Sequence, residues 1–98
     1  MADSHAFLAE LEAIIDQRLR DRPNGSYVTR LSDQGPRKIA QKIGEEGVEL
    51  ALAVATGDRE EAVSEAADLV FHTLLALRTL DLKLEHVCLE LRRRHAKD

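Results

Sequence analysis

Two long helical stretches separated by only two residues constrain the fold of this chain more than any other feature. Residues 36–56 and 59–79 both place their apolar side chains at a spacing of about 100° per residue, which predicts two helices. Gly57 and Asp58 lie between them, a pair typical of one helix ending and the next beginning. A connection this short favours an antiparallel helical hairpin.

The rest of the chain also follows helical patterns, and no convincing alternating strand pattern is present. We expect a first helix over 4–20 with Ser4 as its N-cap, a short helix over 26–34, and a last helix over 83–95. The last helix is expected to bury four side chains: Leu84, Val87, Cys88 and Leu91. Residues 1–98 are therefore predicted to form a single all-α domain.

Composition narrows the function classes. Aromatic residues make up only 3% of the chain, and its formal net charge is −4, so a broad basic surface for nucleic acid is absent. No signal-peptide pattern opens the chain, and no apolar stretch approaches the roughly 20 residues needed to span a bilayer. We expect a cytoplasmic protein without membrane contact, whose small aliphatic core is completed by a homo-oligomer.

An acidic stripe lies on the helix predicted for 36–56. Five charged side chains fall within an arc of roughly 100°: Lys38, Lys42, Glu45, Glu46 and Glu49. Carboxylates on so narrow a stripe repel each other unless a cation or a proton intervenes. The same helix contains Gly44 and Gly47, each costing about 1 kcal/mol relative to alanine, which suggests that a neighbouring helix or a ligand passes close by.

A second polar stripe lies on the helix predicted for 59–79, which is otherwise apolar nearly all round and therefore looks like the most buried element. Its members follow at intervals of four, three and four: Glu61, Glu65, Asp68 and His72. In an antiparallel hairpin, Glu65 and Asp68 can face the three glutamates of the first stripe. Mg²⁺ bound through oxygen is the natural compensation for such a cluster, and Mg²⁺ also binds substrate phosphates. Lys38 and Lys42 would lie beside it and hold the phosphates.

Simpler interpretations exist for each of these features. The acidic stripe alone is more typical of a solvated helix face, or of a salt-bridge ladder with Lys38 and Lys42, than of a metal site. Only the second stripe on the facing helix makes the metal site an equal alternative. His72 is more typical of a hydrogen-bonded residue between helices than of a metal ligand. The basic run 92–95 most simply complements the dipole at the end of the last helix, and Cys88 most simply packs as a small apolar residue.

Several motifs, in order and spacing, resemble phosphoribosyl-ATP pyrophosphohydrolase, a branch of the MazG-like all-α nucleoside triphosphate pyrophosphohydrolases. The resemblance covers most of the chain and rests on four segments: Ser26-Tyr27-x-x-x-Leu31, Lys38-x-x-x-Lys42-Ile43-Gly44-Glu45-Glu46-x-x-Glu49, Glu65-Ala66-Ala67-Asp68-Leu69 and Glu90-Leu91-x-x-Arg93. Relatives usually have alanine where this chain has Gly47, and Lys83 stands where a better helix N-cap is expected.

The resemblance implies a MazG-like bundle of about four to five helices, completed by homodimerisation. It implies cleavage of phosphoribosyl-ATP to phosphoribosyl-AMP and pyrophosphate, the second step of histidine biosynthesis, with Mg²⁺ as cofactor. Some relatives are fused to the cyclohydrolase of the next step, which makes phosphoribosyl-AMP cyclohydrolase a candidate partner. The metal ligands implied by the family pattern are Glu45, Glu46, Glu49, Glu65 and Asp68. Glu46 and Glu49 are the expected catalytic carboxylates.

Three alternatives stay open at this point: a house-cleaning hydrolase of free nucleoside triphosphates, a di-iron carboxylate bundle, and a non-catalytic dimerisation module. The Glu-x-x-His spacing typical of di-iron bundles is absent here, because His72 follows Asp68 by four residues. The sequence does not identify the number of metal ions, the general base, or the groups that read adenine and ribose. Tyr27, Arg30 and Ser32 precede the acidic helix and are candidates for the last role.

Overall fold

The protein is built from helices that end close to the predicted boundaries. A computed structural model describes residues 3–96, and this part of the chain contains α-helices and one short 3₁₀ helix. The elements in chain order are η1 (Ser4–Ala6), α1 (Phe7–Asp21), α2 (Tyr27–Gln34), α3 (Pro36–Thr56), α4 (Arg59–Thr79) and α5 (Leu84–His95). The all-α class predicted from the sequence is confirmed. No helix within the described residues is both long and apolar enough to cross a membrane.

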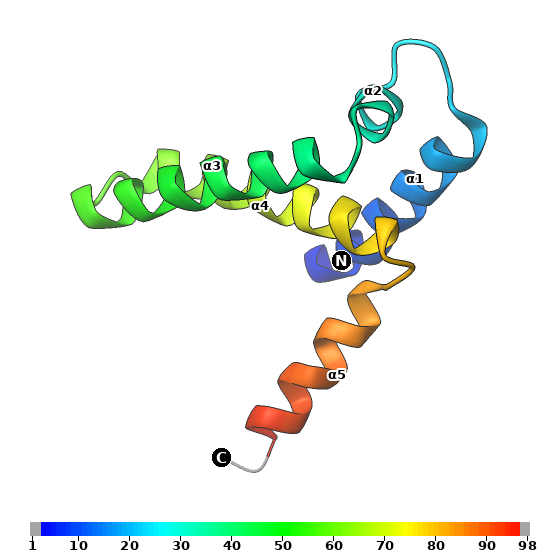
Figure 1. Cartoon of the computed structure of the whole chain (residues 1–98). Helices are drawn as coiled ribbons and strands as arrows, with labels where there is room; N and C mark the ends of the chain where they lie inside the picture. The colour runs from blue at the N-terminus through cyan, green and yellow to red at the C-terminus, as the bar shows by residue number, and fades with distance from the viewer. Residues whose placement is uncertain (1–2, 97–98) are drawn as a thin grey trace.

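Local capping chemistry explains where the central helices begin and end. Gly57 adopts φ 74° and ends α3, because glycine carries no side chain to clash in the left-handed conformation. The Asp58 side chain then accepts a hydrogen bond of 3.1 Å from the backbone of Glu61 and starts α4. As a result α3 and α4 form the predicted antiparallel hairpin, and they lie side by side along most of their length (Figure 1).

The N-terminal caps differ in one case from the sequence prediction. Ser26 caps α2 by accepting a hydrogen bond from the backbone of Thr29 at 3.2 Å. Ser4, however, is not the N-cap of the first helix. Asp3 accepts the hydrogen bond from the backbone of His5 at 3.0 Å, and the chain enters α1 through the 3₁₀ turn. Asp and Ser are comparable N-caps, so a sequence with both side by side does not decide between them.

The core lies where α1, α2, α3 and α4 meet at one end of the hairpin. It consists of buried aliphatic side chains from all four helices: Ile15, Val28, Leu31, Ile39, Leu74 and Leu75. Phe71 and Ile43 pack against this cluster from α4 and α3. This anchors α2 at the end of the hairpin where α3 begins and α4 ends.

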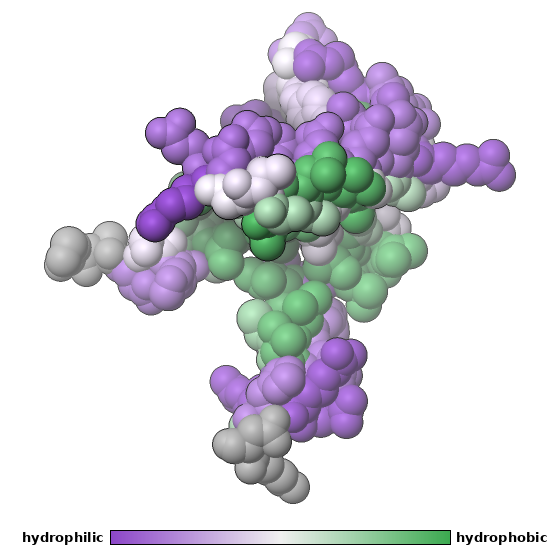
Figure 2. All heavy atoms as spheres, turned by 90° about the vertical axis from the view of Figure 1, so that its left-hand side faces the viewer, coloured by the Kyte–Doolittle hydropathy of each residue, from purple (hydrophilic) through white to green (hydrophobic). Residues whose placement is uncertain are grey.

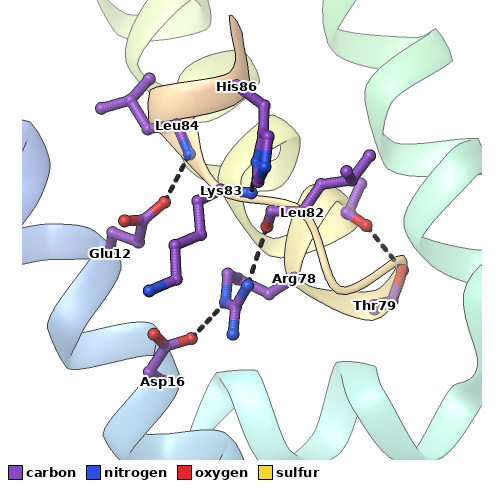
Figure 3. A network of polar contacts seen from close by, with 9 residues as sticks. Glu12, Asp16, Arg78, Thr79, Leu82, Lys83, Leu84 and His86 are labelled. Carbon is purple, nitrogen blue, oxygen red and sulfur yellow. Dashed lines mark hydrogen bonds and ion pairs between the residues drawn. The ribbon is translucent and has the colours of Figure 1, made fainter.

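A polar network attaches the root of α5 to α1 (Figure 3). Arg78 at the end of α4 donates hydrogen bonds to Asp16 at 2.5 Å and to the carbonyl oxygen of Leu82 at 2.9 Å. The backbone N–H of Leu84, the first residue of α5, donates to the carboxylate of Glu12 at 2.6 Å. Glu12 thus supplies the capping acceptor that Lys83 lacks, so a residue distant in sequence compensates for the poor N-cap.

Beyond this root α5 projects away from the other helices (Figure 1). Of the four side chains expected to face inward, only Leu84 packs against the core, and it is partly buried. The expectation is wrong for the other three in the single chain, because Val87, Cys88 and Leu91 are exposed. The amphipathic pattern correctly indicates a helix, but it does not say which surface the apolar side contacts.

The expectation that α4 is the most buried element holds for only one of its sides. Val63 is 71% exposed and Val70 is 41% exposed, although both belong to its apolar surface. Seen toward the tip of the hairpin, an apolar area lies between the hydrophilic side of the molecule and the distal, hydrophilic part of α5 (Figure 2).

The two glycines of α3 have no close neighbour from another helix within residues 3–96. Apart from the backbone of α3 itself, a Cβ atom added at Gly44 or at Gly47 would meet no atom within 4 Å. Close approach of another described helix is therefore not the reason for these glycines.

Candidate functional site

The α3–α4 hairpin brings the two acidic stripes onto facing helices. The structure buries one predicted ligand on each helix, Glu46 on α3 and Glu65 on α4, each with 8% of its surface exposed. The other three predicted ligands are exposed: Glu45, Glu49 and Asp68. Buried carboxylates are rare in proteins unless they are paired or bind a cation.

Glu46 is held by the side chain of His72. The Nδ1 atom of His72 lies 2.6 Å from Oε1 of Glu46 and 3.0 Å from the backbone oxygen of Asp68. On the opposite side of the ring, Nε2 lies 2.8 Å from the hydroxyl oxygen of Tyr27 on α2. His72 is 5% exposed, so these contacts satisfy a polar ring inside the protein. The prediction that His72 is a hydrogen-bonded residue between helices is confirmed.

Glu65 lies in a second acidic group, nearer to the tip of the hairpin. The neighbouring carboxyl groups of Glu49 and Glu61, and after them burial, raise the pKa of Glu65 from 4.5 to about 7. The Oε2 atom of Glu65 is buried and has no hydrogen-bond partner. A carboxylate that holds a proton near neutral pH because other carboxylates surround it is a typical position for a bound cation.

The sequence prediction did not include Glu61 or Tyr27 in the acidic site. Glu61 lies one helical turn before Glu65, and this four-residue spacing is the signal that could have added it to the ligand candidates. Tyr27 was predicted only as one of three candidates for contact with the substrate. Its hydrogen bond to His72 depends on the packing of α2 against the hairpin, which no local pattern reveals.

The two lysines of the acidic stripe are not part of a salt-bridge ladder. Within residues 3–96, neither Lys38 nor Lys42 forms an ion pair with a carboxylate. Lys38 instead lies 3.5 Å from the side-chain oxygen of Gln41, and Gln41 donates to Glu45 at 3.3 Å. Both lysines are half-buried on the helix that carries the glutamates. The salt-bridge interpretation of this stripe is therefore wrong.

Two of the three candidates for contact with the substrate, Tyr27 and Arg30, lie together near the start of α2. The guanidinium of Arg30 lies 5.8 Å from the centre of the Tyr27 ring and donates a 3.2 Å hydrogen bond to the backbone oxygen of Gly25. Tyr27 also packs against Phe71, with ring centres 6.0 Å apart. Ser32 is half-buried at the next turn of α2. These contacts account for the positions of Tyr27 and Arg30, and their role toward a substrate stays a prediction.

The described part of the chain holds no ready-made metal centre. In residues 3–96, no three His, Cys, Asp or Glu side chains are arranged closely enough to hold a metal ion. The acidic residues instead divide into the Glu46–His72 contact and the Glu49–Glu61–Glu65 group. The five-carboxylate magnesium site is thus still a prediction.

Fold and site together define an all-α chain with facing acidic helices and adjacent lysines. Comparison with known proteins gives the family. The family profile described as Phosphoribosyl-ATP pyrophosphohydrolase matches residues 8–95, and the chain belongs to this family. The family and enzyme class predicted from the sequence, a hydrolase of histidine biosynthesis, are confirmed.

Two kinds of relative are similar to this chain. The Phosphoribosyl-ATP pyrophosphatase of Novosphingobium aromaticivorans is 49% identical over 89% of this chain and 81% of its own length. The protein of the same name from Rhizobium etli is 43% identical over 92% of this chain and 84% of its own length. The Histidine biosynthesis bifunctional protein HisIE of Xanthomonas axonopodis is 47% identical over 91% of this chain. The chain spans only 43% of the length of that bifunctional protein.

Proposed function

We propose that this chain hydrolyses phosphoribosyl-ATP to phosphoribosyl-AMP and pyrophosphate, with Mg²⁺ as cofactor. The name and high coverage of the monofunctional relatives support the substrate. One structural observation carries the chemistry: Glu65 has a buried oxygen without a partner, beside the carboxylates of Glu49 and Glu61. Without a cation this group retains a proton near neutral pH, and a divalent cation would replace that proton.

The side chains at the hairpin fit a hard divalent cation. All the donors are carboxylate oxygens, which Mg²⁺ prefers, and no cysteine lies among them. The proposed ligands are Glu45, Glu46, Glu49, Glu65 and Asp68. Bound Mg²⁺ polarises phosphate oxygens and lowers the pKa of a bound water. Both ring nitrogens of His72 are already hydrogen-bonded within the protein, so His72 is not proposed as a ligand.

The other residues of the site would bind the triphosphate and handle the proton. Lys38 and Lys42 have no carboxylate partner within residues 3–96, so their ammonium groups are available to the phosphate chain. Glu46 and Glu49 are the proposed catalytic carboxylates, which orient the attacking water and accept its proton. Glu46 is held in place by His72, whereas Glu49 is exposed at the surface of the hairpin.

The proposal includes a homodimer, because the single chain exposes more surface than a compact protein of its size. A folded monomer of this mass exposes about 5,600 Å², whereas the chain exposes 7293 Å². The excess is about 1,700 Å² per chain, and pairing two such surfaces would bury about 3,400 Å², within the range of obligate homodimers. The radius of gyration of 14.8 Å also exceeds the ~12.6 Å expected for a compact domain of this length.

Apolar side chains mark the surface that a second copy would cover. Phe7 and Leu8 of α1 line a groove together with Val63 and Val70 of α4. The isolated helix α5 has only 12 residues, and helices of that length are marginal in water unless another surface covers their apolar side. A second copy of the chain would supply such a surface, and it would account for the excess exposed area of each chain.

Two further properties belong to the proposal. The relatives named as bifunctional proteins of histidine biosynthesis carry additional sequence beside the region that this chain matches. Functional coupling to phosphoribosyl-AMP cyclohydrolase, which would consume the product, is part of the proposal. A cytoplasmic location stays a prediction.

The test is pyrophosphate release by the purified chain from phosphoribosyl-ATP, dATP and dUTP, each with and without Mg²⁺. The proposal predicts Mg²⁺-dependent release from phosphoribosyl-ATP and at most marginal release from the two deoxynucleotides. Comparable release from dATP or dUTP would favour a house-cleaning hydrolase. Absence of release from all three substrates would favour a non-catalytic dimerisation module.

A further inference from the structure

Glu46 is the only proposed ligand on α3 that is buried, and its position depends on a side chain from α4. The Nδ1 atom of His72 contacts both Oε1 of Glu46 at 2.6 Å and the backbone oxygen of Asp68 at 3.0 Å. One imidazole nitrogen therefore links a proposed ligand of α3 to the backbone of a proposed ligand of α4. Of these two contacts, the one to Glu46 crosses from α4 to α3.

The hydrogen-bond partners determine which ring nitrogen carries the proton. Nδ1 faces two acceptors, the carboxylate of Glu46 and the carbonyl oxygen of Asp68, so Nδ1 is the donor. Nε2 then accepts the hydrogen bond that the Tyr27 hydroxyl donates at 2.8 Å. The two acceptors at Nδ1 fix this tautomer, and the Tyr27 hydroxyl complements it at the other ring nitrogen.

Packing holds this arrangement from the side. The ring of His72 meets the Tyr27 ring edge-on at 5.7 Å and the Phe71 ring edge-on at 5.3 Å, measured between ring centres. His72 is 5% exposed, so water does not compete for its two ring nitrogens. An imidazole enclosed in this way has one orientation, and so has the carboxylate that it contacts.

We propose that His72, oriented by the Tyr27 hydroxyl, is a positioning residue that holds the Glu46 carboxylate in the geometry needed for magnesium and for the triphosphate. This inference rests on the proposed function, in which Glu46 takes part in metal binding. It assigns to His72 and Tyr27 roles that neither the acidic motif nor the family description contains. Removal of outer partners of metal-bound groups typically costs about 10–100-fold in metal affinity or activity.

Two substitutions of similar size separate a positioning role from a merely structural one. In His72→Asn the side-chain amide nitrogen lies where Nδ1 lay and still donates to Glu46. In His72→Gln the amide lies at the level of Nε2, toward Tyr27, and the contact to Glu46 is lost. Tyr27→Phe keeps the ring packing and removes only the hydroxyl. Ile15→Val in the core of α1 is the control, because it loosens packing without touching the site.

The readouts are Mg²⁺ affinity by calorimetry, kcat and KM for phosphoribosyl-ATP, and the thermal midpoint. We expect His72→Gln to weaken Mg²⁺ binding and to lower kcat by about 10–100-fold, His72→Asn to recover most of that loss, and Tyr27→Phe to fall between them. Ile15→Val should lower the thermal midpoint and leave Mg²⁺ affinity and kcat unchanged.

Equal Mg²⁺ affinity and kcat for wild type, His72→Gln and Tyr27→Phe would overturn the inference while leaving the proposed function intact. Equal losses in His72→Asn and His72→Gln would also overturn it, since retaining the donor to Glu46 would then have no effect. If His72→Gln does not fold, the comparison of His72→Asn and Tyr27→Phe with wild type decides in the same way. A wild-type chain that neither binds Mg²⁺ nor releases pyrophosphate would instead refute the proposed function.

Discussion

The middle of the α3–α4 hairpin and the α5 end of the molecule contrast in what they bury. In the hairpin, the polar groups of Glu46, His72 and Glu65 are enclosed by protein. At α5, apolar side chains such as Leu89 and Leu91 are exposed instead. Burying polar groups costs free energy. Leaving a row of apolar groups exposed loses the favourable free energy that their burial would provide. The hairpin therefore has the character of a functional site, and the α5 end has the character of an assembly surface.

Both regions are also incomplete in the single chain, but in different ways. The hairpin has a buried carboxylate oxygen on Glu65 without a partner, which a cation would satisfy. The α5 end lacks a covering surface beyond its root, where Glu12 and Arg78 attach it to the bundle.

Neutralising Glu49 should have the largest effect on activity. We expect Glu49→Gln to lower kcat more than about 100-fold, because losses of 10–100-fold are typical even for groups behind the ligands. The fold should persist, since shape is kept and repulsion with Glu65 is relieved. Steady-state kinetics and circular dichroism measure the two effects. Glu10→Gln, an exposed change on α1, is the control, and full activity of Glu49→Gln would contradict the role of this carboxylate.

A charge introduced at Val63 tests the apolar groove between α1 and α4, which is part of the proposed dimer surface. Val63→Glu should convert the dimer to a monomer, because a carboxylate would be buried in the interface. If the chain is a monomer, the same substitution at a side chain that is 71% exposed should change the free energy of unfolding by no more than about 0.5 kcal/mol. Sedimentation equilibrium distinguishes the outcomes. Gln17→Glu adds the same charge on the exposed surface of α1 and should leave the dimer unchanged.

The raised pKa of Glu65 predicts how pH affects the metal-free protein. Its pKa is about 7 in the folded chain and 4.5 in the reference state, so the folded chain holds the proton more tightly. The resulting stabilisation is present in full below pH 4.5 and is lost as pH rises through 7. In the presence of a chelator, urea unfolding should show lower stability at pH 8 than at pH 6.

Glu65→Gln provides the control for this pH dependence. The variant should lose the part of the slope between pH 6 and pH 8 that comes from Glu65, and adding Mg²⁺ at pH 8 should stabilise the wild type more than the variant. A wild-type stability that is unchanged or rises over this interval would show that the acidic group is not strained in the folded chain.

The smallest expected effect concerns Gly47. A Cβ atom at this position meets nothing within 4 Å, so alanine fits the chain. Gly47→Ala should raise the free energy of unfolding by about 1 kcal/mol, the usual helix preference of alanine over glycine. Urea unfolding of both forms measures it. A destabilised Gly47→Ala dimer would show instead that a second copy passes close to this residue.

Sequence reasoning predicted the central hairpin almost to the residue, and the reason is local. Gly57 and Asp58 combine a left-handed C-cap with a side-chain N-cap, and both depend only on neighbouring residues. The prediction failed where an apolar side has no partner in the same chain. Val87 and Leu91 have the spacing of an inward-facing surface, but spacing does not say whether the partner is the same chain or another one.

The candidate site was predicted only where it depends on the spacing of residues within one helix. The acidic residues and their facing helices follow from spacing, so Glu49 and Glu65 were expected to lie together, as they do. The contact between Tyr27 and His72 joins residues 45 positions apart in the sequence. It depends on how α2 packs onto the hairpin, which is a tertiary property that a single sequence does not encode in any local pattern.

The most direct test of the central claim is a calorimetric titration of Mg²⁺ into wild type and Glu65→Gln at pH 8. We expect wild type to bind Mg²⁺, and we expect Glu65→Gln, which removes the buried charge and keeps the side-chain shape, to bind Mg²⁺ at least about 10-fold more weakly. Equal binding by the two proteins, or no binding by the wild type even with a non-hydrolysable phosphoribosyl-ATP analogue present, would contradict it.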